Sequence, residues 1–520
     1  MIAKMAKQRN YARHPPAYIP LSLIIFGGLC FVGLALFSLR SVSPYIDTSF
    51  QIGISREPSL EAFFRRVAAD NQAPGAQFVF WLVARAGLSS DIAQRAVSLL
   101  LASSCYLAAI LGGTTVHRGK SGEQQNGPKG TIILAAILTI LAAGVFPISA
   151  FVRYSSFVGP LWLFVFILVD RFRRGETSVA FAIGITTGLA FIVSYTAILL
   201  VISVAVALLP DCRNRVAVQK LVIGTIAGLI PLLTWLALAG SAHIHNVFSR
   251  VDPAEERLTS RALVGKTYEL LAWMFVGPAS LPTFAGLLIL AVFAMGSLSL
   301  VWIAIKREHV HVLPLIAFTV LPLPFLFATK IAAGWSMVGP TAVLAFVAGL
   351  GAGRLDRGAS VVQAMLIVCT AALSSLPAAN LLILRPDAFA SRASLAAAAG
   401  LQLARDHPSA LLVCADWTTC LLTSEATPAQ FSGVLNLAQF AAATDKDLSG
   451  YIVFLLGDGG TSASAGEEQL ARDRVKNLGY TVERSEQIAP YEGATLRSWL
   501  RMNSQPGQYV VEEWYRSPDR

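Results

Sequence analysis

Long apolar runs alternate with short polar segments along most of the chain. A helix needs about 20 apolar residues to cross a bilayer, and a further run, Ser178 to Pro210, is longer than one crossing requires. The pattern predicts a helical protein that passes through a membrane many times. Runs of spanning length lie near 19–39, 94–116, 131–151, 156–170, 218–240, 281–304, 311–329, 335–353 and 359–383.

The charges beside these runs indicate which side of the membrane each loop faces, because basic loops stay on the cytoplasmic side. The run Ser178–Pro210 has basic flanks at both ends, 171–174 before it and 213–215 after it. An even number of crossings must lie between these flanks, so we expect two short helices with a turn near 194–196. The chain then has about eleven spans, with its N-terminus inside and its C-terminus outside.

Composition excludes a soluble globular protein. Of the 520 residues, 55% are hydrophobic and 14% are charged, whereas soluble domains carry roughly 25% charged residues. The formal net charge of +10 comes from short clusters between apolar runs. Such clusters are topology signals, so we expect membrane lipids and no nucleic acid as partners. The basic N-terminus leads into an apolar run without a small-residue cleavage site, which predicts a retained first span.

After Leu384 the composition becomes that of a soluble α/β domain. We therefore expect a transmembrane part, 1–384, with an outer loop at 43–93, and an exported domain, 385–520. Short apolar runs predict strands at Leu411–Cys414, Tyr451–Leu456 and Tyr480–Val482, with helices near 391–405, 427–443 and 466–477 and a hairpin around Asn503–Gly507.

Two of the six cysteines, Cys414 and Cys420, fall in the exported domain. Thiols tend to pair in an oxidising compartment, and this short separation lets the chain turn back far enough for a disulfide. The alternative is a buried strand cysteine and a helix cysteine, both reduced. No paired CxxC occurs, so the sequence gives a thiolate zinc site no support; a divalent metal elsewhere stays possible without a motif behind it.

The polar stretch Ser43 to Trp81 separates the first two spans and holds four carboxylates. Charges persist at a membrane surface where water, a partner or a substrate stabilises them, so this stretch is a candidate functional site. An amphipathic connector lying on the bilayer is the alternative. The carboxylates are Asp47, Glu57, Glu61 and Asp70.

Cations are expected on the same side of the membrane, at Arg153 with Tyr154 and at Lys330. Carboxylates and cations together suit the deprotonation of a hydroxyl near a lipid-linked phosphate. His243 and His245 fall in an expected outer loop, and two isolated histidines lack the third ligand of a catalytic metal. We expect them to be loop residues.

The order of several motifs resembles the C-type glycosyltransferase superfamily, which includes protein mannosyltransferases and the aminoarabinose transferase of lipid A. In those enzymes an acidic motif follows the first span, then an Asp segment containing Pro, then an Arg-x-x-Ser that opens the second span. The likeness is good over roughly Leu21 to Pro210. The matching pieces are Asp47-Thr48, Asp70 to Gly75, Arg95 to Ser98, Arg153-Tyr154 and Ser194-Tyr195-Thr196.

The chain departs from the family pattern at three places. Thr48 stands where the family usually has Glu, and Gln72-Ala73 stand in place of His-Pro. Lys330 takes the position of an Arg-Tyr motif without matching it closely. These differences leave Asp47 as the main candidate for the catalytic base.

The resemblance implies an inverting glycosyltransferase of the bacterial inner membrane. It would transfer a sugar from a polyprenyl-phosphate donor to a lipid or glycan acceptor, such as lipopolysaccharide, on the outer face. Asp47 would be the base, and Asp70 would orient the acceptor or the loop. Arg153, Tyr154, Lys330 and Arg95 would bind the donor phosphate; Tyr195 and Glu57 would line the acceptor cavity. For Asp70, a helix-cap or turn role beside Asn71 and Pro74 is the alternative. A non-catalytic scaffold and a transporter or flippase stay open as alternatives. A transporter would carry ionisable residues within its spans, whereas the apolar runs here are nearly free of charge.

Overall fold

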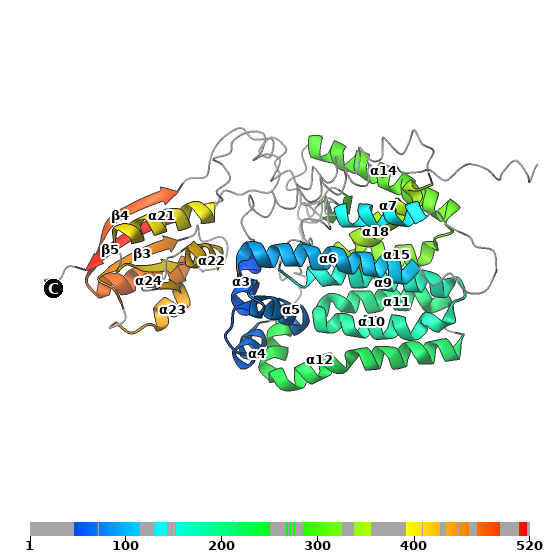
Figure 1. The fold of residues 1–520 in the computed structure, drawn as a ribbon, viewed down its shortest axis with the longest axis horizontal. Coiled ribbons are helices and arrows are strands. Elements are labelled where there is room, and N and C mark those ends of the chain that lie inside the picture. Colours follow the sequence, from blue (N-terminus) through cyan, green and yellow to red (C-terminus); the bar gives the residue numbers. More distant parts are fainter. Residues whose placement is uncertain are drawn as a thin grey trace, which may run out of the picture.

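A computed structural model of the chain gives its fold (Figure 1). It describes residues 46–70, 72–114, 129–142, 145, 149, 152–211, 213–249, 267–268, 270–271, 274–275, 284–324, 337–354, 392–407, 409–415, 417–426, 433–445, 448–456, 465–488 and 509–516. Lys330, the expected spans 19–39 and 359–383 and the expected turn Asn503–Gly507 lie outside these residues.

Helix α9 (Ser155–Arg173) is the centre of a helical bundle. It is buried on nearly all sides, and Trp162 donates a hydrogen bond from Nε1 to the carbonyl oxygen of Phe318, at 3.2 Å. A helix surrounded by others needs apolar residues on every face, and α9 is apolar all round. The helices packed on it are α6 (Asp91–Thr114), α10 (Ala180–Val193), α11 (Ile198–Leu208), α15 (Val312–Thr319) and α18 (Val338–Ala352).

The outer helices of the bundle expose apolar side chains. Leu238 of α12 (Arg215–Ser249) is 79% exposed, and Met295 of α14 (Phe284–Arg307) is 62% exposed. Among the described residues, four helices are long and apolar enough to cross a membrane, within 91–114, 155–173, 215–241 and 290–307. This pattern is consistent with a polytopic membrane protein, whose outer faces contact lipid.

The long run Ser178–Pro210 forms two helices, as predicted. Helix α10 ends at Val193, a short turn η3 (Tyr195–Ala197) follows, and α11 begins at Ile198. The Ser194 side chain caps the turn by accepting a hydrogen bond from the backbone amide of Thr196, at 3.3 Å. The membrane side on which this turn lies stays a prediction.

Helices α10 and α12 pack with their backbones in direct contact. Both carry two glycines four residues apart, Gly184 and Gly188 on one and Gly224 and Gly228 on the other. A Cβ at Gly188 would come within 2.5 Å of the Thr225 carbonyl oxygen, and one at Gly228 within 2.3 Å of that of Ile185. Small residues at this spacing let membrane helices approach closely. The end of α10 therefore lies against the second half of α12.

Three short helices cover one end of the bundle: α3 (Ile46–Ser55), α4 (Leu60–Ala69) and α5 (Pro74–Arg85) (Figure 1). Ser59 caps α4 by accepting a hydrogen bond from the Ala62 amide, at 3.1 Å, and Pro74 opens α5 at a position where its missing N–H costs nothing. Phe63 and Val67 of α4 are buried. The polar stretch after the first span is thus a folded cap of helices.

The C-terminal residues form a five-stranded sheet in the order β2-β1-β3-β5-β4. The first three strands are parallel, and β5 pairs antiparallel with both β3 and β4. Central parallel strands are covered on both faces, which explains the unbroken apolar run of β3. The strands are β1 (Leu411–Cys414), β2 (Val434–Asn436), β3 (Tyr451–Leu456), β4 (Tyr480–Ile488) and β5 (Tyr509–Arg516).

Alternate residues of these strands face two different helix pairs. Ile452 and Phe454 pack towards α23 (Leu437–Ala442) and α24 (Ala465–Asn477), whereas Val453 and Leu455 pack towards α21 (Arg392–Asp406) and α22 (Trp417–Ala426). The α/β class of this domain agrees with the sequence expectation. The single helix expected near 427–443 is wrong in its first part, because strand β2 occupies 434–436 and the helix α23 is limited to 437–442; α22, at 417–426, was not expected.

Candidate functional site

The capped end of the bundle gathers several of the residues that the sequence singles out. Gly75 lies so close to the end of α10 that a Cβ there would come within 2.6 Å of the Ile192 carbonyl oxygen. This close contact fixes the start of α5, and with it the Asp70 segment, beside the turn at Tyr195. Because α12 packs along α10, its C-terminal part reaches the same place.

Tyr195 belongs to a hydrogen-bonded cluster with two side chains of α12. Its hydroxyl lies 2.7 Å from Nε2 of His243, and Nε1 of Trp235 lies 3.3 Å from both the hydroxyl oxygen and the imidazole nitrogen. Nδ1 of His243 lies 3.1 Å from the carbonyl oxygen of Ala68. His243 has no exposed surface, while Tyr195 is half-buried.

The partners of His243 define its tautomer. A carbonyl oxygen can only accept, so Nδ1 carries the proton that bonds to Ala68, and Nε2 of the neutral ring is left as the acceptor. The Tyr195 hydroxyl then donates to Nε2, and the Trp235 N–H is shared between the phenolic oxygen and Nε2. The phenolic oxygen keeps acceptor capacity for a further donor.

Asp70 ends helix α4 two residues after Ala68 and lies at this cluster. Its carboxylate accepts a hydrogen bond from Nε2 of Gln77, at 3.1 Å, and its segment reaches the cluster through the contact between Ala68 and His243. Asp70 is half-buried. The structure therefore brings together Asp70 and Tyr195, which the sequence placed on one side of the membrane, and adds Gln77, Trp235 and His243.

Sequence reasoning missed His243, and its assignment to a loop is wrong. The apolar run of α12 weakens near 240, but the helix continues to Ser249 past a kink at Gly240, whose φ is 78°. Glycine adopts that backbone conformation without strain. One signal could have placed His243 in the helix. It lies two turns after Trp235, and Gly240 is the one helix-breaking residue in the sequence between Trp235 and Ser249.

Asp47 is the second residue of α3, and its side chain is outside the described part of the structure. The helix that carries it is firmly placed. Gln94 of α6 donates to the hydroxyl of Ser55 at 2.6 Å, and Ile52 packs with Phe80 of α5 and with Val152.

Arg153 and Tyr154 come directly before α9, next to that apolar contact of Val152 with α3 and α5. The guanidinium of Arg153 lies 5.5 Å from the centre of the Tyr154 ring, and both side chains are half-buried. The structure thus places the Arg153 segment beside the helix that holds Asp47.

Arg95 and Glu57 each have a local partner. Arg95 is buried in the first turn of α6, where its guanidinium lies 3.4 Å from the carboxylate of Asp91. Glu57 forms an ion pair with Arg66, and its carbonyl oxygen accepts a hydrogen bond from Nε1 of Trp81 at 3.0 Å. These contacts hold the cap together, so Glu57 has a structural role whatever else it does.

The described residues include no group of three His, Cys, Asp or Glu side chains that could hold a metal ion. The polar cluster around Tyr195 is made of neutral nitrogen and oxygen groups beside one carboxylate. Within the described part, the contacts of this cluster are hydrogen bonds.

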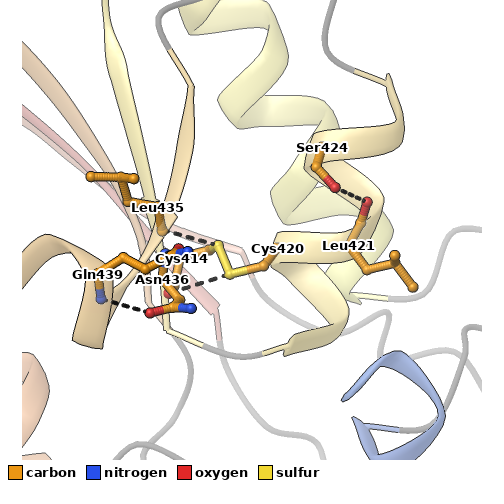
Figure 2. Close-up of a disulfide and its surroundings, with 7 residues drawn as sticks. All are labelled: Cys414, Cys420, Leu421, Ser424, Leu435, Asn436 and Gln439. Carbon is orange, nitrogen blue, oxygen red and sulfur yellow. Dashed lines mark hydrogen bonds between the residues drawn. A yellow bond between two sulfur atoms is a disulfide. The ribbon is translucent and has the colours of Figure 1, made fainter. Parts of the chain in front are cut away.

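Cys414 and Cys420 are joined by a disulfide in the structure (Figure 2). Their α-carbons lie 5.4 Å apart, within the usual range for such a bond. Cys414 ends strand β1 and Cys420 lies in the first turn of α22, so the bond ties that helix to the sheet.

Two solved structures share the fold of this chain over nearly its full length. The chain is similar to crystal structures of ArnT, an aminoarabinose transferase from Cupriavidus metallidurans. The structure of ArnT bound to undecaprenyl phosphate matches with a TM-score of 0.52 and 13% identity, over 94% of this chain and 97% of that chain. The apo structure matches with a TM-score of 0.54 and 13% identity, over 95% and 98%.

No protein-family model matches the sequence, and no curated protein matches it. The similarity to ArnT is therefore one of fold, and the fold agrees with the one that the order of the motifs implies.

Proposed function

We propose that this protein is a membrane glycosyltransferase that takes a sugar from a polyprenyl-phosphate donor and transfers it to a lipid or glycan acceptor on the outer face of the bacterial inner membrane. The observation that carries the proposal is the fold shared over nearly the full length with ArnT, one of whose structures holds undecaprenyl phosphate. The motifs that resemble the superfamily lie at the capped end of the bundle, which supports one site there.

The transfer divides into one bond formed and one bond broken. The acceptor hydroxyl oxygen attacks the anomeric carbon of the donor sugar, its proton passes to the carboxylate of Asp47, and the bond between that carbon and the phosphate oxygen breaks. Attack from the side opposite the phosphate inverts the anomeric centre. Polyprenyl phosphate leaves with the bonding electrons.

The leaving phosphate needs positive charge and hydrogen-bond donors. Arg153 supplies a planar guanidinium beside the helix of Asp47, with Tyr154 at its side. Lys330 is proposed as a second cation. Arg95 is proposed to act from the start of α6, where its pairing with Asp91 places it among buried groups. Asp70, Tyr195 and Glu57 are proposed to line the acceptor side.

Mass spectrometry of envelope glycolipids tests this function. In a deletion strain, the mass spectrum of the extracted lipids and glycans should lack species that are one sugar heavier than the accumulated precursor. Wild-type protein should restore them, whereas Asp47→Asn should lower transfer by about 100-fold to 10,000-fold, the usual effect of losing a general base.

A matched control is Glu61→Gln, the same acid-to-amide change at a side chain that is 81% exposed and pairs only with its neighbour Arg65 among described contacts. It should transfer like the wild type at equal membrane abundance. Unchanged envelope masses in the deletion strain would argue against the function, and full transfer by Asp47→Asn would argue against the assigned base.

A further inference from the structure

His243 is a fully buried polar side chain at the capped end, and nothing in the motif pattern assigns it a role. It joins three elements at once. Nδ1 contacts Ala68 at the end of α4, Nε2 contacts Tyr195 between α10 and α11, and the ring itself belongs to α12. A buried imidazole whose two nitrogens both have partners is held in one orientation.

We propose that His243 is a positioning residue for the acceptor side of the site. This inference rests on the proposed function. His243 fixes the position of the Tyr195 hydroxyl relative to the Ala68 to Asp70 segment, so that the phenolic oxygen and the Asp70 carboxylate can bind the hydroxyl groups of one acceptor molecule.

Three observations support this role. The Tyr195 hydroxyl donates to His243 and receives the Trp235 N–H, which leaves its oxygen able to accept one more hydrogen bond. Asp70, a pure acceptor when ionised, lies at the same place and is oriented by Gln77. Both Tyr195 and Asp70 are half-buried, whereas His243 is fully enclosed, so the imidazole acts through its neighbours. Two acceptor oxygens fit the hydroxyl groups of a sugar.

Two substitutions of His243 by an amide side chain distinguish its hydrogen bond to Ala68 from its hydrogen bond to Tyr195. The amide of His243→Asn can occupy the position of Nδ1 and donate to the Ala68 carbonyl, but it does not reach Tyr195. The longer side chain of His243→Gln can place an amide oxygen near the position of Nε2 and accept from Tyr195. His309→Asn is the matched control, because His309 is exposed and its φ of 55° suits asparagine.

Transfer is measured with undecaprenyl-phosphate-linked sugars as donors and, as acceptor, the lipid extract of cells lacking the protein. In His243→Asn the KM for the extract should rise about tenfold, the effect of losing one well-aligned hydrogen bond, with the KM for the donor within about twofold of the wild type. His243→Gln should recover most of the loss, and His309→Asn should match the wild type.

Thermal unfolding in detergent gives a second readout that needs no activity. Tyr195→Phe and His243→Asn remove the same hydrogen bond, so the double variant should unfold at about the temperature of the less stable single variant. Additive shifts would overturn the contact. Wild-type transfer with an unchanged extract KM in His243→Asn would overturn the inference alone, whereas absence of transfer by the wild type would overturn the proposed function and the acceptor role with it.

Discussion

The guanidinium of Arg153 lies against the Tyr154 ring at the start of α9. Contact between an arginine and an aromatic face fixes the guanidinium plane, and hydrogen bonds form at the edge of that plane. That geometry suits a phosphate, because two N–H groups on one edge match two phosphate oxygens. A lysine in this place would keep the charge but lose the paired hydrogen bonds.

Substitution of Arg153 should therefore distinguish charge from geometry. Arg153→Lys should lower kcat/KM for the donor by about tenfold, and Arg153→Ala by about a further tenfold or more, since hydrogen bonds to charged groups contribute roughly 1.5–3 kcal/mol. Steady-state kinetics with a lipid-linked sugar measures both. Arg65→Ala is the control, because the Arg65 side chain is 78% exposed and pairs with Glu61. Equal activity of the Lys and Ala variants would argue against a phosphate contact.

At the level of single residues, local motifs singled out Asp70 and Tyr195. The structure brings them to one cluster, and their roles stay predictions. His243 and Trp235 have no such pattern. Their place depends on the packing of α12 against α10 and on a glycine kink, and both are properties of distant contacts that a local pattern cannot contain.

Among the elements, the pair α10 and α12 has the closest contact. The four glycines that face one another leave no room for side chains between the two backbones. Since Tyr195 follows α10 and both Trp235 and His243 belong to α12, this packing sets the distance across the polar cluster. The site geometry is thus fixed by apolar contacts some turns away from it.

A leucine at Gly228 should separate these helices. Its Cβ would lie 2.3 Å from a backbone oxygen, and overpacking of this kind costs roughly 1–3 kcal/mol. Gly228→Leu should lower both the unfolding temperature in detergent and the transfer rate. Gly296→Leu is the control, because no atom lies within 4 Å of a Cβ built there. Equal behaviour of the two variants would show that the close packing has no such role.

The bounds of the strands were predicted best where the strands are fully buried. Strands β1 and β3 have the predicted bounds, because both are short unbroken apolar runs covered on two faces. The two short helices of Ser178–Pro210 were also predicted, from loop charge and length. The region after β1 was not, since α22 has no clear apolar periodicity and β2 has only three residues, placed by pairing with β1.

In the molecule as a whole, the C-terminal domain contacts the helical cap through α22 (Figure 1). Leu421 packs into the apolar cluster of Ile52, Phe80 and Val152. Beside it, the Glu425 carboxylate pairs with Arg56 and accepts a hydrogen bond from the Asp91 amide at 2.7 Å. An anion at the first turn of a helix is favourable, because the helix dipole is positive there.

The disulfide lies at the other end of this docking helix. It joins the last residue of β1 to the first turn of α22, so the sheet, the helix and the cap form one connected path. Breaking a bond that closes so short a loop costs about 2 kcal/mol at most through chain entropy. The larger effect should be on the direction of α22, and therefore on the contact between the domain and the cap.

This arrangement predicts two linked results. Mass mapping without reductant should give Cys414 and Cys420 in one cross-linked pair of peptides, and two freely alkylated thiols would exclude the bond.

Hydrogen exchange should then show the first-turn amides of α6, Asp91 above all, protected in the wild type and faster in both Glu425→Ala and the double variant Cys414→Ser/Cys420→Ser. Glu425→Gln keeps an acceptor for the Asp91 amide and should stay close to the wild type. If exchange at Asp91 is unchanged in Glu425→Ala, the domain does not dock in this way; if it changes there but not in the serine variant, the docking holds without help from the disulfide.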